Sequence, residues 1–221
     1  MDSLVLLSGG LDSAVLVAAE AAHARVYPVY VSVGLAWESS ERAIVEKLLA
    51  APIFDGNVRP LSVVEFNMRD VYSPQHWAIT GTPPAYDTPD EDVYLAGRNL
   101  VLLTKAGVVA AAKKIRRIAL GPLAGNPFPD ATPEFFAAMA RALSLGLNHE
   151  IEVVTPLASM HKEDVIKLGS RLGVPLGDTL SCMNPVETQH CGLCSKCRER
   201  RDAFAAAGID DPTTYRNKSP R

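Results

Sequence analysis

Short apolar segments of strand length alternate with longer segments of helical length along most of the chain. The short segments are rich in β-branched and aliphatic residues, which favour strands, and the longer ones have spaced apolar positions, as helices that cover a core do. Five segments are expected to be strands, at residues 3–7, 26–33, 61–66, 116–120 and 151–154. This alternation predicts an α/β fold, in which a parallel sheet has helices on both faces.

Capping residues set the limits of some expected helices. Thr132 suits an N-cap, Pro133 suits the first helical position, and Gly173 suits a C-cap. The proline-rich residues 71–94 show no periodicity and are expected to form a long loop. The expected helices begin at residue 13, span 38–49 and 99–113, begin again at 133, and span 162–172.

Bulk composition restricts the classes of function. Of the 221 residues, 48% are hydrophobic and 21% are charged, which is typical of a globular protein with a full core. The net charge of -3 favours a small-molecule substrate over a nucleic-acid partner. A secretory signal and an apolar run of membrane-spanning length are both missing from the sequence, so we expect a cytoplasmic protein with no membrane partner. We expect one main domain, residues 1–175, with a C-terminal segment, 176–221, packed on it.

Two adjacent glycines mark the passage from the first expected strand to the first expected helix. The string reads Ser8-Gly9-Gly10-Leu11-Asp12-Ser13. At such a junction exposed backbone N–H groups and the helix dipole favour an anion, and glycine lets the chain approach a phosphate closely. The hydroxyl groups would donate to phosphate oxygens, and Asp12 could hold Mg²⁺. A tight turn is the simpler alternative, but the complete string at this position favours a phosphate-binding loop.

All four cysteines of the chain lie close together near its C-terminus. Cys182, Cys191, Cys194 and Cys197 are spaced C-x8-C-x2-C-x2-C. In a reducing compartment this crowding indicates a metal site more than disulfides. Four thiolates suit one tetrahedral Zn²⁺ per chain, and the ion would be structural because no coordination position is left for water. An iron–sulfur cluster, or His190 as a substitute ligand, are the alternatives.

The glycine string resembles the PP-loop of ATP pyrophosphatases, which activate a substrate oxygen by adenylation and release pyrophosphate. Combined with the C-terminal cysteines, it makes the chain similar, over nearly its whole length, to the 7-cyano-7-deazaguanine synthases of queuosine biosynthesis. Intervening segments follow the order of that family, at residues 97–99, 129–135, 162–175 and 191–200. The resemblance implies an adenine nucleotide alpha-hydrolase-like, Rossmann-like fold with a zinc-binding helical tail.

The same resemblance implies an ATP-dependent C–N ligase that forms a nitrile in two stages. In the family, 7-carboxy-7-deazaguanine is adenylated and captured by ammonia as an amide, whose oxygen is then activated and eliminated. ATP with Mg²⁺ would be the co-substrate, the partners would be small molecules with no nucleic acid bound directly, and the chain would be a homodimer. Residues 8–13 would bind pyrophosphate and Mg²⁺, and Asp12, Arg98 and Lys162 are the candidate catalytic residues.

Two segments depart from the pattern of this family. Residues 33–38 lack its Gln and His, residues 121–128 are shortened, and Ala131 stands where the family has Cys. Both segments are expected to border the substrate crevice, so a paralogue that adenylates another carboxylate, or joins it to another amine, is an alternative. A non-catalytic zinc-ribbon binding protein is a further alternative, which the acidic balance and the complete loop disfavour.

Overall fold

The computed structural model describes residues 1–218, and these form an α/β fold on a parallel sheet of five strands. The strands are β1 (Asp2–Leu6), β2 (Arg25–Ser32), β3 (Ser62–Glu65), β4 (Arg117–Ala119) and β5 (Glu152–Val154). They lie in the order β3-β2-β1-β4-β5, and each neighbouring pair is parallel. All five expected strands are confirmed, with limits that differ from the expected ones by one residue at most.

Strand order reverses at β1, because the chain adds β2 and β3 on one side and then crosses to the other side for β4. The connections that follow β1 and β4 therefore leave the sheet in different directions. A crevice opens at such a switch point, beyond the carboxyl ends of the strands, and open α/β sheets bind ligands there.

Seven helices cover the sheet or extend from it within residues 1–218: α1 (Leu11–Ala21), α2 (Glu38–Leu49), α3 (Trp77–Thr80), α4 (Arg98–Ala112), α5 (Pro133–Leu147), α6 (Lys162–Leu172) and α7 (Ser195–Ala207). Thr132 is confirmed as an N-cap, since its side chain accepts the N–H of Phe135. The expected loop at 71–94 is mostly irregular but contains α3, which forms because the His76 side chain accepts the N–H of Ala78.

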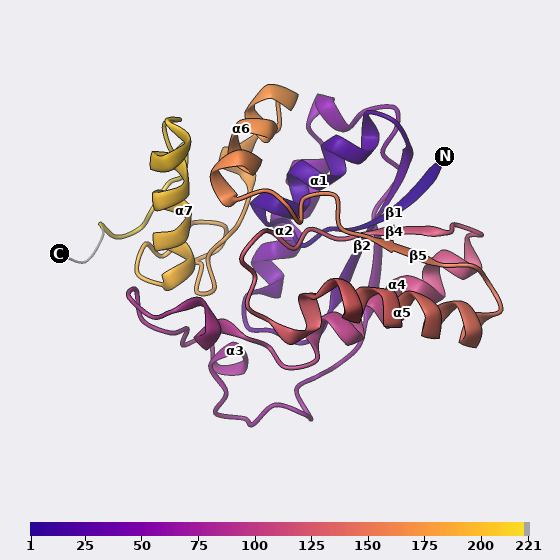
Figure 1. Ribbon diagram of the computed structural model, residues 1–221. Helices are drawn as coiled ribbons and strands as arrows, with labels where there is room; N and C mark the ends of the chain where they lie inside the picture. The colour runs from indigo at the N-terminus through magenta and orange to yellow at the C-terminus, as the bar shows by residue number, and fades with distance from the viewer. Residues whose placement is uncertain (219–221) are drawn as a thin grey trace.

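Alternate residues of β1 point to opposite faces of the sheet and contribute to separate cores. Leu4 and Leu6 belong to the core that includes α4 and α5, whereas Val5 and Leu7 belong to the core that includes α1 and α6. In Figure 1, α4 and α5 lie below the sheet, and α1 and α6 lie above it. The expected cover of helices on both faces is confirmed. Within residues 1–218, every helix is too short or too polar to cross a membrane.

The C-terminal segment packs against the main body through α7, which lies beside α6 (Figure 1). Arg200 of α7 is fully buried and its guanidinium donates to the carbonyl oxygen of Leu176 over 2.7 Å and to Thr179 over 2.9 Å. The N–H of Leu180 donates to the carbonyl of Gly9 over 2.9 Å, so the segment reaches the glycine loop. The division of the chain at residue 175 stays a prediction, and residues 219–221 lie outside the described residues.

Candidate functional site at the switch point of the sheet

The glycine loop joins β1 to α1 and leaves the start of α1 open. Gly9 has a φ of 80°, in the left-handed region that glycine enters without strain. Gly10 is the N-cap residue, and it has no side chain with which to satisfy the first N–H groups of the helix. These groups remain available to an anion, which the positive end of the helix dipole also favours.

Hydroxyl groups and packing fix the shape of this loop. Ser13 Oγ donates to the carbonyl oxygen of Gly10 over 2.9 Å, and Ser8 Oγ lies 3.3 Å from Ser13 Oγ. A Cβ atom at Gly9 would lie 3.1 Å from methyl groups of Ile44 and Val45 on α2. Gly9 is thus required by close packing as well as by its backbone conformation.

A cavity of about 290 Å³ opens beside the loop. Its walls come from the loop, the end of β2, α2, the start of α4 and residues 120–130. Of the predicted site residues, Ser8, Gly10, Asp12, Ser13 and Arg98 line the cavity. Gly9, Leu11 and Lys162 do not line it, although Lys162 contacts Asp12 directly. The fold thus brings together the loop, Arg98 and half of the 121–130 segment, which are distant in sequence.

The two carboxylate oxygens of Asp12 have different surroundings. Oδ2 accepts a hydrogen bond from Lys162 Nζ over 2.7 Å, whereas Oδ1 is buried with no hydrogen-bond partner among residues 1–218. Burial acts to lower the pKa of Lys162, but the charges of Asp12 and Glu199 outweigh it and raise the pKa, so the ammonium form is kept. A buried carboxylate oxygen without a partner, in the wall of a cavity, is a suitable ligand for a cation.

Arg98 is the first residue of α4 and is positioned by a cap from another segment. Asp130 Oδ2 accepts the N–H of Asn99 over 3.1 Å, and Asn99 Nδ2 donates to the carbonyl oxygen of Asp130 over 2.9 Å. Arg98 Nε is buried and lacks a hydrogen-bond partner in the described part of the chain. Because an unpaired buried donor is costly, this guanidinium is ready to bind an anionic or carbonyl group that enters the cavity.

Glu41 of α2 is a buried acid in the wall of the cavity. Tyr30 Oη donates to Glu41 Oε2 over 2.8 Å, and Trp37 Nε1 donates to Oε1 over 3.0 Å. Burial raises the pKa of Glu41, although the charge of Arg98 acts in the opposite direction. Burial also raises the pKa of Tyr30, so its phenol stays protonated as a donor.

Residues 33–38 are expected to border the substrate crevice, but none of them lines this cavity, and Leu35 and Trp37 are buried in the core instead. Trp37 stacks on Trp77, with ring centroids 5.7 Å apart. Glu38 accepts the N–H groups of Val33 and Gly34, which folds this segment back on itself and away from the cavity.

Two aromatic rings meet in the wall of the cavity from segments that are both irregular. Tyr94 and Phe128 are stacked, with ring centroids 5.1 Å apart and an angle of 25° between the rings. Tyr94 ends the long loop at 71–94, and Phe128 belongs to the segment that precedes α5. Such a pair offers an apolar surface against which a flat heterocycle can pack.

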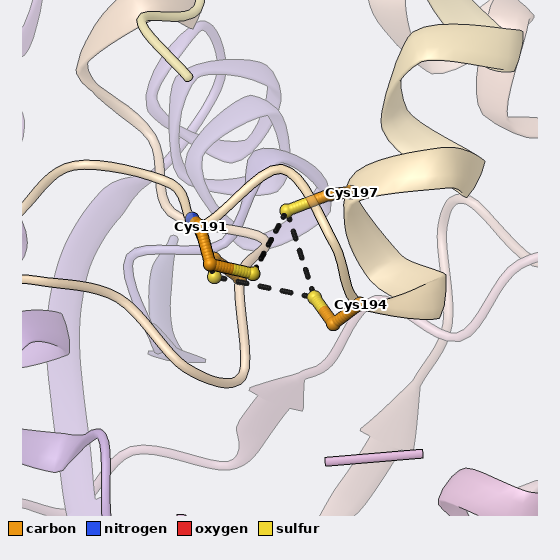
Figure 2. Close-up of side chains that lie close together, drawn as sticks. Cys191, Cys194 and Cys197 are labelled. Carbon is orange, nitrogen blue, oxygen red and sulfur yellow. Dashed lines mark hydrogen bonds between the residues drawn. The ribbon is translucent and has the colours of Figure 1, made fainter. Parts of the chain in front are cut away.

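The four cysteines converge at the start of α7, as predicted. All are buried, and their sulfur atoms lie within 4.8 Å of one another. Cys194 Sγ lies 3.5 Å from Cys197 Sγ and 4.0 Å from Cys182 Sγ, and Cys191 Sγ lies 3.9 Å from Cys197 Sγ. Figure 2 shows Cys194 and Cys197 at the first turn of the helix, pointing toward Cys191 on the preceding loop. Four thiolates around one ion at ~2.3 Å would be about 3.8 Å apart, so these distances fit a four-cysteine metal-binding group.

The surroundings of the sulfur atoms support this interpretation. The backbone N–H groups of Asn184 and Cys191 donate to Cys182 Sγ over 3.3 and 3.2 Å, and such bonds stabilise thiolates that ligate a metal. His190 was the alternative ligand, but its Nε2 accepts the N–H of Ser181 over 3.0 Å. Burial lowers the pKa of His190 to about 3, which keeps the ring neutral for that contact.

Sequence reasoning missed several residues that the fold places at or beside the site: Tyr30, Glu41, Tyr94 and Glu199. A signal existed for Glu41, because it follows Trp37 by one helical turn and the two side chains can therefore meet. No local pattern indicated Glu199, whose partner Lys162 lies on a different helix.

The fold and the site together define a class of protein, an α/β protein with a glycine loop at the switch point of a parallel sheet and a C-terminal four-cysteine metal-binding group. The family model of queuosine biosynthesis protein QueC matches residues 2–208. The chain belongs to this family and is an enzyme of it.

Relatives named 7-cyano-7-deazaguanine synthase match nearly the whole chain. The relative from Thermosynechococcus vestitus is 32% identical, over 96% of this chain and 95% of its own length. The relative from Methanopyrus kandleri is 30% identical, over 96% of this chain and 98% of its own length. The relative from Pseudomonas fluorescens is 33% identical, over 96% of this chain and 95% of its own length. Among solved structures, the U34-tRNA thiolase NcsA from Methanococcus maripaludis with its [4Fe-4S] cluster matches with a TM-score of 0.48 and 12% identity, over 93% of this chain and 67% of that chain.

Proposed function

We propose that this protein is an ATP-dependent C–N ligase that converts 7-carboxy-7-deazaguanine and ammonia to 7-cyano-7-deazaguanine through an adenylated intermediate. One observation carries the proposal: a single cavity holds the open start of α1, the unpaired oxygen of Asp12 and the unpaired guanidinium nitrogen of Arg98. These groups can receive a phosphate chain, a cation and a carboxylate side by side. The relatives named 7-cyano-7-deazaguanine synthase support the nitrile product, and the family resemblance implies the acid from which it is made.

The nucleotide would bind with its phosphates at the start of α1. Backbone N–H groups of the loop and the hydroxyls of Ser8 and Ser13 would contact the β- and γ-phosphates, which leave together as pyrophosphate. Asp12 Oδ1 would bind Mg²⁺, and its lack of a partner in the described chain fits that role. The ion, when bound, offsets the negative charge that develops on the leaving pyrophosphate.

The deazapurine acid would occupy the part of the cavity between Arg98 and the aromatic pair. Tyr94 and Phe128 would pack against the flat ring, while Arg98 would hold the carboxylate near the α-phosphate. These apolar rings also keep water from the adenylate, which would otherwise hydrolyse. Burial of Leu35 and Trp37 in the core means that the changed 33–38 segment does not argue against this substrate.

The chemistry needs orientation and charge stabilisation and no nucleophilic side chain. A carboxylate oxygen attacks the α-phosphate and pyrophosphate leaves; ammonia then attacks the acyl carbon, and the amide forms as AMP departs. A second ATP activates the amide oxygen in the same way, with release of another pyrophosphate. Loss of AMP and a proton from that species leaves the nitrile. The preorganised loop and Arg98 serve both stages because each begins with an oxygen at the same α-phosphate.

We assign one structural Zn²⁺ per chain to the four cysteines. The donor set is entirely sulfur, and the sulfur separations fit one tetrahedral ion. An iron–sulfur cluster would place several atoms between the thiolates and hold them farther apart. With four protein ligands, the ion would fix the fold of the C-terminal segment and take no part in the reaction.

The remaining elements of the proposal are small-molecule partners, a cytoplasmic location and a homodimer. The acidic net charge of -3 supports neither direct nucleic-acid binding nor attraction to an anionic membrane. Cysteines kept as metal ligands suit a reducing compartment. Leu100, Val108 and Leu145 are exposed on α4 and α5, and they support an apolar contact with a second copy.

The test is incubation of the purified, metal-loaded protein with ATP, Mg²⁺, ammonium and 7-carboxy-7-deazaguanine, followed by mass spectrometry. We expect the amide first and then the nitrile, with pyrophosphate released in each stage. Folded protein that makes neither product refutes the proposal. Release of pyrophosphate with another acid, and none with the deazapurine, would select a paralogue with the same activation step. No acid-dependent release at all would select a non-catalytic binding protein.

A further inference from the structure

Lys162 connects the glycine loop to α7, the helix that contains Cys197 and has Cys194 as its N-cap residue. Its Nζ lies 2.7 Å from Asp12 Oδ2 and 3.0 Å from Glu199 Oε1. Glu199 lies on α7, two residues after Cys197, and its other oxygen is 2.5 Å from Lys196 Nζ. Two carboxylates from different ends of the chain therefore share one ammonium group.

The ion pair between Lys162 and Glu199 has little access to solvent. The side chains of Lys162 and Glu199 are only 20% and 26% exposed, so solvent screens this pair weakly.

A divalent cation at Asp12 Oδ1 would share the charge of the carboxylate with Lys162, which is bound to Oδ2. When Mg²⁺ with a nucleotide binds Asp12, it takes up the charge of that carboxylate, and the attraction between Asp12 and Lys162 falls. Lysine has a flexible four-carbon stem, so an ammonium released by Asp12 would move unless a second partner retained it. Glu199 is that second partner, and it lies outside the cavity where the cation would bind.

We propose that Glu199 is a positioning residue that keeps Lys162 beside the phosphate-binding loop when Mg²⁺ and nucleotide occupy Asp12. This inference rests on the proposed function only in that the loop binds a magnesium–nucleotide complex. It does not depend on which acid is activated.

The same geometry couples the metal centre to the loop. Cys194 is the N-cap residue of α7 and Cys197 lies in its first turn, so a bound metal fixes the start of this helix. Glu199 follows within the next turn and takes its position from that anchor. Loss of the metal should therefore weaken nucleotide binding at a loop that contains none of the metal ligands.

The test uses Glu199→Gln in the full-length, metal-loaded protein. Titration calorimetry would measure the binding of ATP, with and without Mg²⁺, in the absence of any acid substrate. We expect Kd for magnesium–ATP to rise about 10-fold, with a clearly smaller change for ATP without magnesium, because only the cation competes for Asp12. Glu199→Asp, which keeps the charge on a shorter side chain, should recover part of the lost affinity.

Asp90→Asn is the matched control. Asp90 Oδ1 lies 3.3 Å from Nζ of Lys196, the lysine that also pairs with Glu199. Asp90 does not contact Lys162. We expect its Kd for magnesium–ATP to stay within about 2-fold of the native value, with the metal content of both variants unchanged.

Three results would overturn the inference: an unchanged Kd in folded, metal-loaded Glu199→Gln, an equal loss with and without Mg²⁺, or no binding of magnesium–ATP by the native protein. A protein that binds magnesium–ATP as expected and converts no deazapurine would refute the proposed function alone.

Discussion

The backbone N–H of Leu180 donates a hydrogen bond of 2.9 Å to the carbonyl oxygen of Gly9. This bond joins the cysteine-rich segment to the second residue of the glycine loop. Arg200, buried on α7, secures the same segment through the carbonyl oxygen of Leu176 and the hydroxyl of Thr179. The position of the loop backbone therefore depends on whether the C-terminal segment is folded.

Removing the metal should destabilise the protein. Cys197→Ser, or a chelator, should lower the midpoint of thermal unfolding by roughly 5 °C or more, because binding of the metal contributes to folding of the segment. Calorimetry with elemental analysis checks this. Ser195→Ala is the control, since Ser195 Oγ is buried with no partner among the described residues and its loss should leave metal content unchanged. Complete loss of metal with an unaltered midpoint would contradict a structural ion.

Asp12→Asn should reduce acid-dependent pyrophosphate release by about 100-fold or more, since the amide binds Mg²⁺ poorly and leaves the charge of pyrophosphate uncompensated. The rate is measured at saturating ATP and Mg²⁺. Asp178→Asn is the control, because it removes the same functional group from a surface ion pair, in which Asp178 Oδ1 lies 2.7 Å from Lys47 Nζ. Its rate should stay within about 2-fold of the native rate. Similar rates for the two variants would remove Asp12 from the catalytic site.

Arg98→Met should raise the KM for the acid by about 10- to 100-fold, because the carboxylate loses its charged donor. ATP binding, measured separately by titration, should change little. Arg116→Met removes an exposed arginine that pairs with Glu150 at 3.0 Å and should leave both constants unaltered. If KM is unchanged and only ATP binding is lost, Arg98 serves the phosphates and the carboxylate binds elsewhere.

Gly169→Ala should destabilise the fold by about 1–3 kcal/mol, because the new methyl would lie 2.7 Å from a methyl group of Val15 and 2.9 Å from one of Leu176. Gly146→Ala, near the end of α5, meets nothing within 4 Å and should stabilise by up to about 1 kcal/mol through helix propensity. Denaturant titration gives both values. If both substitutions changed the free energy of unfolding in the same direction, the contact between α1 and α6 at Gly169 would have room for a methyl group.

The contribution of Glu199 to stability should depend on pH. The pKa of Glu199 is lowered from its ordinary 4.5 to about 2 in the folded protein, so its ionised form favours folding. That contribution is fully present above pH 4.5 and is lost as the pH falls toward 2. The difference in unfolding free energy between the native protein and Glu199→Gln should therefore shrink across this interval. A difference that stays constant there would show that the carboxylate is not perturbed.

Local signals predicted the framework of the fold well. The limits of α2 and α6 and the cap at Thr132 all follow from periodicity and capping within a few neighbouring residues. The cysteine cluster was equally accessible, because the spacing of metal ligands is itself a local pattern. The sequence therefore predicted the strands, most helices and the metal-binding group before any tertiary contact was known.

Contacts between distant segments could not be predicted in this way. Residues 33–38 do not line the cavity as expected, because the burial of Trp37 depends on Trp77, which lies in a loop without periodicity. Glu41 belongs to the cavity because β2 places Tyr30 beside it. Which charged groups meet at Lys162 is likewise decided by how α1, α6 and α7 pack.

The cap that Asp130 places on α4 limits how this protein can diversify. Residues 121–130 include cavity-lining residues such as Phe128 and also the carboxylate that holds the N–H of Asn99. Residues 121–128 are shorter than the family pattern, yet Asp130 keeps its contact with Asn99, so selection for a new substrate and selection for a stable α4 act on the same few residues. A change of length here must preserve that contact, whereas exchange of single side chains such as Asn126 or Phe128 reshapes the pocket and leaves the cap in place.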